Sequence, residues 1–223
     1  MTHVAKYRIE IGPDFKPSVE DHESVVVIDN LRASSTIVTA LGLGVDEIIP
    51  VQDDEEAFVY KERGYFIAGE SGGSKIDGYD AGNSPVEIAE HCKTSPHTRI
   101  VLKTSNLIPL LSRLKRAYIC SSLNLASVAG CLAGQHTCII AAGGKHGAVE
   151  DLGLAFALCA QLTGVRFDPK MLTSFTKESA AAHHLCSIGY GSDIEFICRA
   201  SIFDVVPVYD GTKIVKAGAM YDR

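Results

Sequence analysis

The stretch of sequence that is most informative about the fold runs Val25-Val-Val-Ile-Asp29-Asn-Leu-Arg32-Ala-Ser34-Ser35-Thr36. Four consecutive β-branched residues are typical of a strand that is buried on both faces. The run ends on the carboxylate Asp29, and the hydroxyl residues that follow are typical of a helix start. A strand that leads directly into a helix favours an α/β fold.

Other short β-branched runs recur along the chain and alternate with segments of helical spacing. The predicted strands are Ser24–Ile28, Glu47–Val51, Phe66–Ala68, Arg99–Leu102, Ala117–Cys120, Cys138–Ala142 and Val205–Tyr209. This alternation predicts a largely parallel sheet covered by helices on both faces, with a cleft beyond the carboxyl ends of its strands. Because no linker or repeat divides the chain, we expect residues 1–223 to form a single domain.

The composition is that of an ordinary globular protein, with 46% hydrophobic and 22% charged residues. The net charge of −6 provides no cationic surface, so we expect neither a nucleic acid nor an anionic membrane as a partner. The seven cysteines lack CxxC spacing and no apolar run is long enough to span a bilayer, which favours reduced core thiols and a cytoplasmic location. A homodimer is expected only from the general frequency of such dimers.

The residues that follow the first quoted strand suit an anion site. Ser34 or Ser35 can cap the helix, whose free N–H groups point at an anion, and Arg32 can add a bidentate contact. We therefore predict that Arg32, Ser34, Ser35 and Thr36 bind a phosphate beside a divalent cation held by Asp29. The alternative is a capped helix with an ion pair between Asp29 and Arg32.

A second segment, from Gly69 to Pro85, combines acids and glycines before another predicted helix. Glu70, Asp77 and Asp80 are candidate oxygen ligands for magnesium, since hard cations prefer carboxylates. The alternative is a solvated loop that is rich in turns.

A third segment, from Ala141 to Asp151, follows a predicted strand and opens a helix. Glu150 and Asp151 either form a metal-binding or acid–base pair, or favour the helix start through the helix dipole. Lys145 and His146 are candidates for contact with the anion, although a loop histidine is more often merely exposed.

Two adjacent histidines, His183 and His184, lie on a later predicted helix. Neighbouring helical positions point in different directions, so the pair is assigned a structural role. The chain has no GxSxG or HExxH motif, which leaves serine hydrolase and zinc protease functions without support.

Taken in order, these segments resemble the 2-phosphosulfolactate phosphatase family, which is magnesium-dependent and associated with coenzyme M synthesis. The stretches that carry the resemblance are Asp29–Thr36, Gly69–Gly73, Gly78–Pro85, Ser122–Ala126 and Ala142–Asp151. The resemblance implies a three-layer α/β/α fold with a mostly parallel, mixed sheet. It also implies magnesium-dependent hydrolysis of the phosphate monoester of a small acidic hydroxy acid, 2-phosphosulfolactate, to sulfolactate and phosphate.

The resemblance, together with the residue types, implies a set of functional residues. The expected catalytic residues are Asp29, Arg32, Glu150 and Asp151. The expected magnesium ligands are Asp29, Glu70, Asp80 and Glu150, and the residues expected to bind the rest of the substrate are Asn83, Ser84, Lys103, Asn106 and Lys145. We expect direct attack by water; attack by Asp29 itself is the alternative, disfavoured because Leu31 stands where a second acid is usual in aspartyl phosphatases.

The chain departs from the family pattern at two places. The family usually has an arginine where this chain has Ser71, and Thr-Thr-Asn-Gly-Thr where this chain reads Lys103-Thr-Ser-Asn106-Leu107. Loss of one cation and gain of Lys103 would move the charge that binds the anion. Two alternatives therefore stay open: a phosphatase for a different phospho-hydroxy acid, such as phospholactate or phosphoglycolate, and a non-catalytic protein that binds a phosphorylated ligand.

Overall fold

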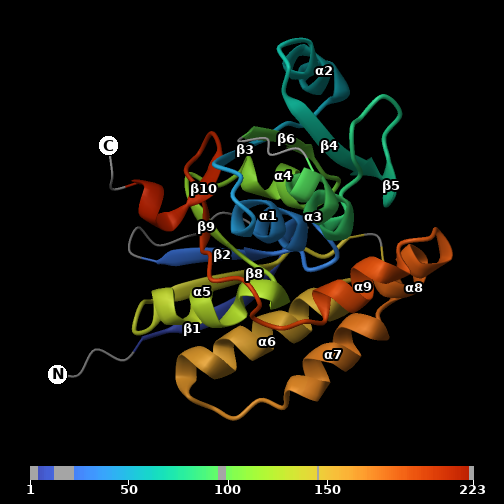
Figure 1. The fold of residues 1–223 in the computed structure, drawn as a ribbon. Coiled ribbons are helices and arrows are strands. Elements are labelled where there is room, and N and C mark those ends of the chain that lie inside the picture. The colour runs from blue at the N-terminus through green and yellow to red at the C-terminus, as the bar shows by residue number, and fades with distance from the viewer. Residues whose placement is uncertain (1–4, 13–22, 95–98, 145, 221–223) are drawn as a thin grey trace.

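The computed structural model of the chain describes residues 5–12, 23–94, 99–144 and 146–220. Its strands are β1 (Tyr7–Ile11), β2 (Ser24–Ile28), β3 (Glu47–Pro50), β4 (Phe66–Ser71), β5 (Ser74–Lys75), β6 (Arg99–Lys103), β7 (Ala117–Cys120), β8 (Thr137–Ala141), β9 (Pro207–Tyr209) and β10 (Ile214–Lys216). In the described part of the chain they form one sheet, in the order β1-β8-β2-β7-β9-β10-β3-β6-β4-β5 (Figure 1). All seven predicted strands are present, whereas β1, β5 and β10 were not predicted.

Two parallel blocks make up most of this sheet. The strands β1, β8, β2 and β7 form one block, and β3, β6 and β4 form the other. The hairpin of β9 and β10 joins the blocks through three antiparallel pairings, so the second block runs opposite to the first. The prediction of a mostly parallel, mixed sheet is therefore confirmed.

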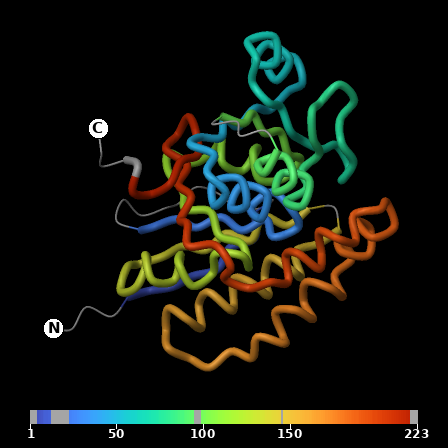
Figure 2. Tube along the Cα trace, viewed as in Figure 1, coloured from blue at the N-terminus to red at the C-terminus, as the bar shows by residue number. Residues whose placement is uncertain are grey.

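Helices cover both faces of the sheet, as the three-layer prediction requires (Figure 1). One layer contains α1 (Ala33–Gly42), α3 (Pro85–Thr94) and α4 (Leu107–Leu111), and the other contains α5 (Leu125–Leu132), α6 (Val149–Thr163) and α7 (Pro169–Lys177). The short η2 (Ser122–Asn124) leads into α5, and its Leu123 joins the core on the α1 side. The remaining helices are α2 (Asp54–Glu62), which packs on β4, the paired α8 (Ala180–Ser187) and α9 (Gly191–Ile197), and the terminal η3 (Ala217–Met220). Figure 2 shows α8 on the side of the molecule where the turn between β4 and β5 lies.

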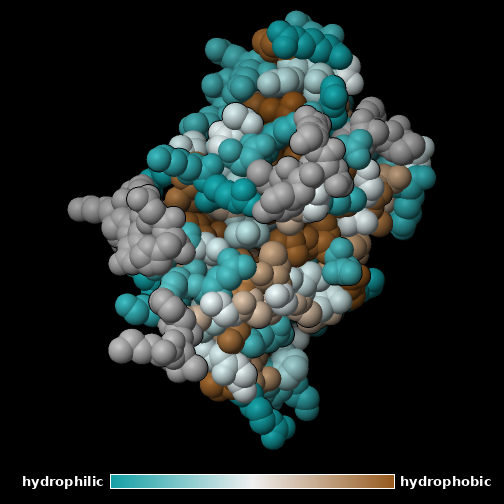
Figure 3. Space-filling model, turned by 90° about the vertical axis from the view of Figure 1, so that its left-hand side faces the viewer, coloured by the Kyte–Doolittle hydropathy of each residue, from teal (hydrophilic) through white to brown (hydrophobic). Residues whose placement is uncertain are grey.

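The surface offers no membrane-spanning element in the described residues, because none of their helices is long and apolar enough to cross a bilayer. On the face in Figure 3, hydrophobic residues form separate patches among hydrophilic ones. The cysteines are all free, and only some of them are core thiols: Cys120 and Cys138 are buried, whereas Cys131 and Cys186 are exposed.

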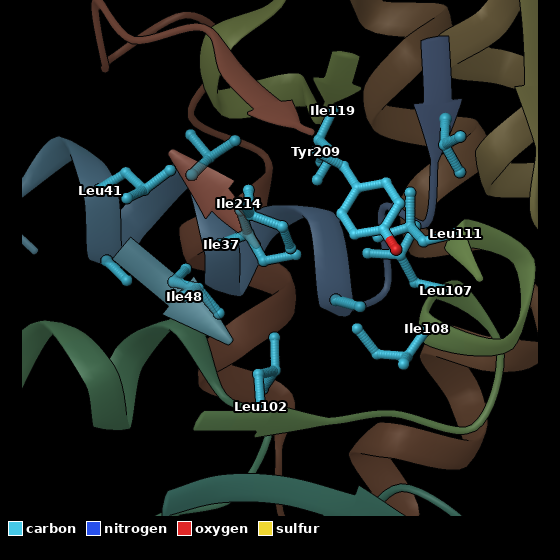
Figure 4. Packing of buried hydrophobic residues seen from close by; sticks show 14 of the residues in the cluster. Ile37, Leu41, Ile48, Leu102, Leu107, Ile108, Leu111, Ile119, Tyr209 and Ile214 are labelled. Atoms are coloured by element: carbon cyan, nitrogen blue, oxygen red, sulfur yellow. The ribbon is translucent and has the colours of Figure 1, made fainter. Parts of the chain in front are cut away.

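Alternation along β2 explains how its apolar run is buried on both faces. Val25 and Val27 join the core that contains α1, whereas Val26 and Ile28 join the core under α5 and α6. Figure 4 shows side chains of α1 meeting those of β3, β6, β7, β9 and β10. Because α1 packs against both blocks of the sheet, the loop that precedes it, residues 29–32, is fixed in position.

Candidate active site

The loop between β2 and α1 opens onto a cavity of about 210 Å³. Its lining comes from the ends of β2, β4, β6 and β8 and the loops after them, from the residues before α3, from the start of α6 and from α8. The lining residues are Asp29, Leu31, Arg32, Glu70, Gly72, Gly73, Asn83, Ser105, Asn106, Gly143, Gly144, His146, Gly147, Glu150, Asp151, Ala181, His184 and Leu185. Seven of the predicted site residues therefore come together here: Asp29, Arg32, Glu70, Asn83, Asn106, Glu150 and Asp151.

The hydroxyl residues of the β2–α1 loop have a different role from the predicted one. The Ser34 Oγ accepts a hydrogen bond from the Asp29 N–H at 2.9 Å, and the Ser35 Oγ donates to the Asn30 carbonyl at 2.8 Å. Both residues and Thr36 are buried and none of the three lines the cavity. The prediction that these side chains bind phosphate is corrected: the hydroxyls of Ser34 and Ser35 satisfy nearby backbone groups and so shape the loop, whereas the buried Thr36 Oγ1 has no hydrogen-bond partner among the described residues.

Arg32 lies in a buried ion pair that sequence reasoning missed. Its Nη1 is 2.7 Å from Asp193 Oδ2, with side chains 1% and 0% exposed. Its Nη2 donates to the Gly73 carbonyl, and the guanidinium lies over the Tyr190 ring, 4.1 Å from the centroid. A single acid in a short helix carries no sequence signal, so Asp193 could not have been predicted.

Ser84 supports this ion pair instead of contacting a substrate. Its Oγ donates to Asp193 Oδ1 at 2.6 Å and accepts from the Glu87 N–H at 3.1 Å at the start of α3. The predicted substrate-binding role of Ser84 is therefore corrected to one of positioning, because its hydroxyl is buried, lies outside the cavity lining and donates its single hydrogen to Asp193.

The Glu70 carboxylate joins two loops of the cavity wall. Its Oε1 accepts from the Ser105 N–H at 2.6 Å, and its Oε2 accepts from the Gly73 N–H at 2.8 Å. Both oxygens thus have backbone partners. The main contributions of Glu70 are therefore its negative charge and the ordering of these two loops, rather than an oxygen that is free to bind a metal.

The Asp151 carboxylate has the same arrangement on the other side of the cavity. It accepts from the Asn30 N–H at 2.7 Å and from the Gly143 N–H at 2.8 Å. Burial, and then the charges of Asp29 and Glu150, raise the pKa of Asp151 well above its usual range, although these hydrogen bonds act against the rise.

Asp29 is a buried carboxyl that other acids face. Burial, followed by the charges of Glu70 and Glu150, raises the pKa of Asp29 to about 7; the Ala33 N–H and Arg32 act in the opposite direction. Burial is also the main reason why the pKa of Glu150 is raised. Ionisation of these acids together is therefore unfavourable at the floor of the cavity, and a bound cation would relieve it.

Two oxygen atoms in the wall of the cavity suit such a cation. Glu150 Oε2 and Asn83 Oδ1 are buried and have no hydrogen-bond partner. Within the described residues no three His, Cys, Asp or Glu side chains are grouped as a complete metal site. Magnesium does not require such a group, because it is commonly held by one or two carboxylates together with water and a substrate phosphate, and the partner-free Glu150 Oε2 is compatible with that kind of site.

Two further predicted residues, Asp80 and Lys103, do not line the cavity. Asp80 is 2.6 Å from the Lys61 Nζ, and Lys103 is 2.8 Å from the Asp54 carboxylate. Asp80 is therefore corrected from metal ligand to partner of a lysine, and Lys103 does not supply the charge that binds an anion, because each charge is already paired outside the cavity. Lys145 lies outside the described residues.

One cavity residue was misjudged, and one residue next to the cavity lining was missed. His184, assigned a structural role, lines the cavity, and its ring stacks on that of His146 with centroids 4.6 Å apart. Asn30 accepts from the Ser122 N–H at 3.0 Å and so ties the loop to η2. The position of Asn30 beside Asp29 was a usable signal, whereas His184 gave none because only tertiary packing brings α8 to the cavity.

Comparisons with known proteins agree with the resemblance. The family model described as 2-phosphosulpholactate phosphatase matches residues 13–212. A Thermotoga petrophila protein named "Probable 2-phosphosulfolactate phosphatase" is 36% identical over 211 residues, which cover 86% of this chain and 92% of that protein. The "2-phosphosulfolactate phosphatase" of Methanothermobacter thermautotrophicus is 31% identical over 204 residues, covering 85% and 88% respectively.

Proposed function

The chain belongs to the 2-phosphosulpholactate phosphatase family, and we propose that it hydrolyses 2-phosphosulfolactate to sulfolactate and phosphate. Membership makes it a phosphoric monoester hydrolase. The observation that supports the proposal best is the cavity in which Asp29, Glu150 and Arg32 meet. We also propose a place in coenzyme M synthesis, which the resemblance implies.

We propose further that magnesium binds at the floor of this cavity. Asp29 and Glu150 would hold it, because their charges repel each other and Glu150 Oε2 has no partner. When bound, the ion would neutralise charge on the phosphate and lower the pKa of a coordinated water.

The residues of the chain would then position the phosphate and neutralise it. Arg32 is held at the cavity wall by Asp193 and Gly73, and we propose that its charge and its remaining N–H groups act on the phosphate oxygens. Asn106 lies so close to Gly144 that a Cβ there would be 2.7 Å from Asn106 Nδ2, so only glycine lets that amide reach the cavity.

Water is the proposed nucleophile. The transition state of phosphoryl transfer is loose, so positioning and charge stabilisation supply most of the catalysis. Attack by Asp29 is less favoured, because the position two residues on is Leu31, which supplies no acid to protonate the leaving group.

Phosphate release from racemic 2-phosphosulfolactate tests the proposal. We expect turnover with magnesium, loss of turnover with a chelator, and a loss of about 100-fold or more in Asp29→Asn and Glu150→Gln. The matched control is Asp80→Asn, an acid outside the cavity, which should keep near wild-type activity.

The same assay with phospholactate and phosphoglycolate separates the alternatives. Faster turnover of either compound would identify a phosphatase for a different hydroxy acid. Binding without turnover by a folded wild-type protein would identify a non-catalytic relative and contradict the proposal.

A further inference from the structure

Two histidines lie at the rim of the cavity, above its acidic floor. His146 is exposed and His184 is half-buried, whereas Asp29, Arg32 and Glu150 are no more than 5% exposed. The two rings stack with their centroids 4.6 Å apart and their planes at 25°. His146 follows β8 and His184 belongs to α8, so two segments distant in sequence build one imidazole pair.

The turn that orients Arg32 also holds the His184 ring. His184 Nε2 is 3.0 Å from the Gly72 carbonyl oxygen, and a carbonyl only accepts, so this nitrogen donates. The next residue, Gly73, accepts from Arg32 and donates to Glu70. The rim and the floor of the cavity are therefore fixed to the same turn.

Among the described residues that line the cavity, positive charge is scarce compared with the anionic groups of the proposed substrate. 2-Phosphosulfolactate carries a phosphate, a carboxylate and a sulfonate. Among the described lining residues, Arg32 is the only lysine or arginine, and two of its nitrogens already bind Asp193 and Gly73. Four carboxyl groups line the same cavity, so the histidines are the remaining described lining groups that can take up positive charge.

We propose that His146 and His184 bind the sulfonate of the substrate, an inference that rests on the proposed function. The phosphate occupies the floor beside Arg32, and the sulfonate lies at the rim. There His146 donates a ring N–H to a sulfonate oxygen, and His184 donates its Nδ1–H when both of its ring nitrogens carry protons, because its Nε2–H is held by Gly72. Such charge-assisted hydrogen bonds are stronger than neutral ones and select for the sulfonated substrate.

Two substrates that differ only in the sulfonate test this role. 2-Phosphosulfolactate and 2-phospholactate share the phosphate and the carboxylate, so only the former engages the histidine pair. In His146→Gln and in His184→Gln, we expect kcat/KM to fall about 10- to 100-fold for the sulfonated substrate. For phospholactate we expect a change below about threefold, because glutamine at residue 184 still offers an N–H to Gly72.

The matched control is His183→Gln, since His183 neighbours His184 on α8 but is exposed and does not line the cavity. It should leave both substrates unchanged, and thermal unfolding should show that all three variants fold. Equal losses on both substrates, or no loss on either, would overturn the assignment.

If wild-type protein hydrolyses neither compound, the proposed function fails but the subsite is still measurable. Calorimetry with the product sulfolactate should then show weaker binding in His146→Gln and His184→Gln than in His183→Gln. Equal sulfolactate binding by all variants, or none by the wild type, would overturn the sulfonate subsite.

Discussion

Asp29 is kept in a position where its charge is poorly solvated. Burial and the facing acids raise the pKa of Asp29 to about 7 from an ordinary value of 3.8. Between these values the folded state binds the proton more tightly than the unfolded state does. The resulting stabilisation is fully present below pH 3.8 and is lost as the pH rises through about 7.

Thermal unfolding across this range should show the effect. In a chelating buffer we expect the wild-type melting temperature to fall by several degrees, about 2–4 °C per kcal/mol, between mildly acidic and mildly alkaline pH. Asp29→Asn should make the profile less steep, with the remaining slope due to Asp151 and Glu150, and magnesium should raise the wild-type value most at the alkaline end. A wild-type profile without slope would contradict the raised pKa.

The ion pair between Arg32 and Asp193 gives a second prediction. Asp193→Asn leaves the Arg32 charge buried and unpaired, so we expect a loss of about 3–5 kcal/mol in the free energy of unfolding, measured with urea. The exposed pair of Lys61 and Asp80 is the control, because Asp80→Asn should cost about 1 kcal/mol or less. Similar losses in both variants would show that burial of the pair has no energetic consequence.

The residues of the site differ in how far sequence could predict them. Asp29, Arg32, Glu150 and Asp151 were found because each directly follows a predicted strand or opens a predicted helix. Ser34 and Ser35 were misassigned, since a hydroxyl beside a helix start serves the local backbone as readily as it serves a ligand. Asp193 and His184 depend on the docking of α8 and α9, which no local pattern reports.

Among the elements, the strands buried on both faces were the most predictable. The apolar run of β2 predicted its bounds, Ser24–Ile28, because a strand covered on both sides needs no polar residues. β5 and β10 are short, and β10 pairs with β3, more than 160 residues away (Ile214 with Ile48). Such a pairing is set by the tertiary fold, so the reversal of direction between the two blocks could not be predicted.

Close packing of α6 on α7 gives a prediction for helix glycines. A Cβ at Gly153 of α6 would lie 2.6 Å from the Phe175 Cβ of α7, so Gly153→Ala should separate the helices and cost about 1–3 kcal/mol.

Gly130 of α5 is the matched control, since a methyl group on its Cα would meet no other atom within 4 Å. Gly130→Ala should stabilise the protein by about 0.5–1 kcal/mol, because alanine favours helix. Urea unfolding of both variants measures the difference, and a change of the same sign in both would contradict this account of the interface.

At the scale of the whole molecule, the site depends on the complete sheet. Its walls come from loops after β2, β4, β6 and β8, which belong to both parallel blocks, and α1 packs against both blocks. The cavity therefore requires the whole sheet and α8 to fold together. The single domain, the cytoplasmic location and the homodimer remain predictions.

The most direct test of the central claim is a crystal structure with manganese, in place of magnesium, and sulfolactate, using anomalous scattering to locate the metal. We predict one strong peak in the cavity, about 2–2.3 Å from carboxylate oxygens of both Asp29 and Glu150, with the sulfonate beside His146 and His184. A metal bound elsewhere, or a cavity in which Asp29 and Glu150 hold no metal at saturating manganese, would contradict the account.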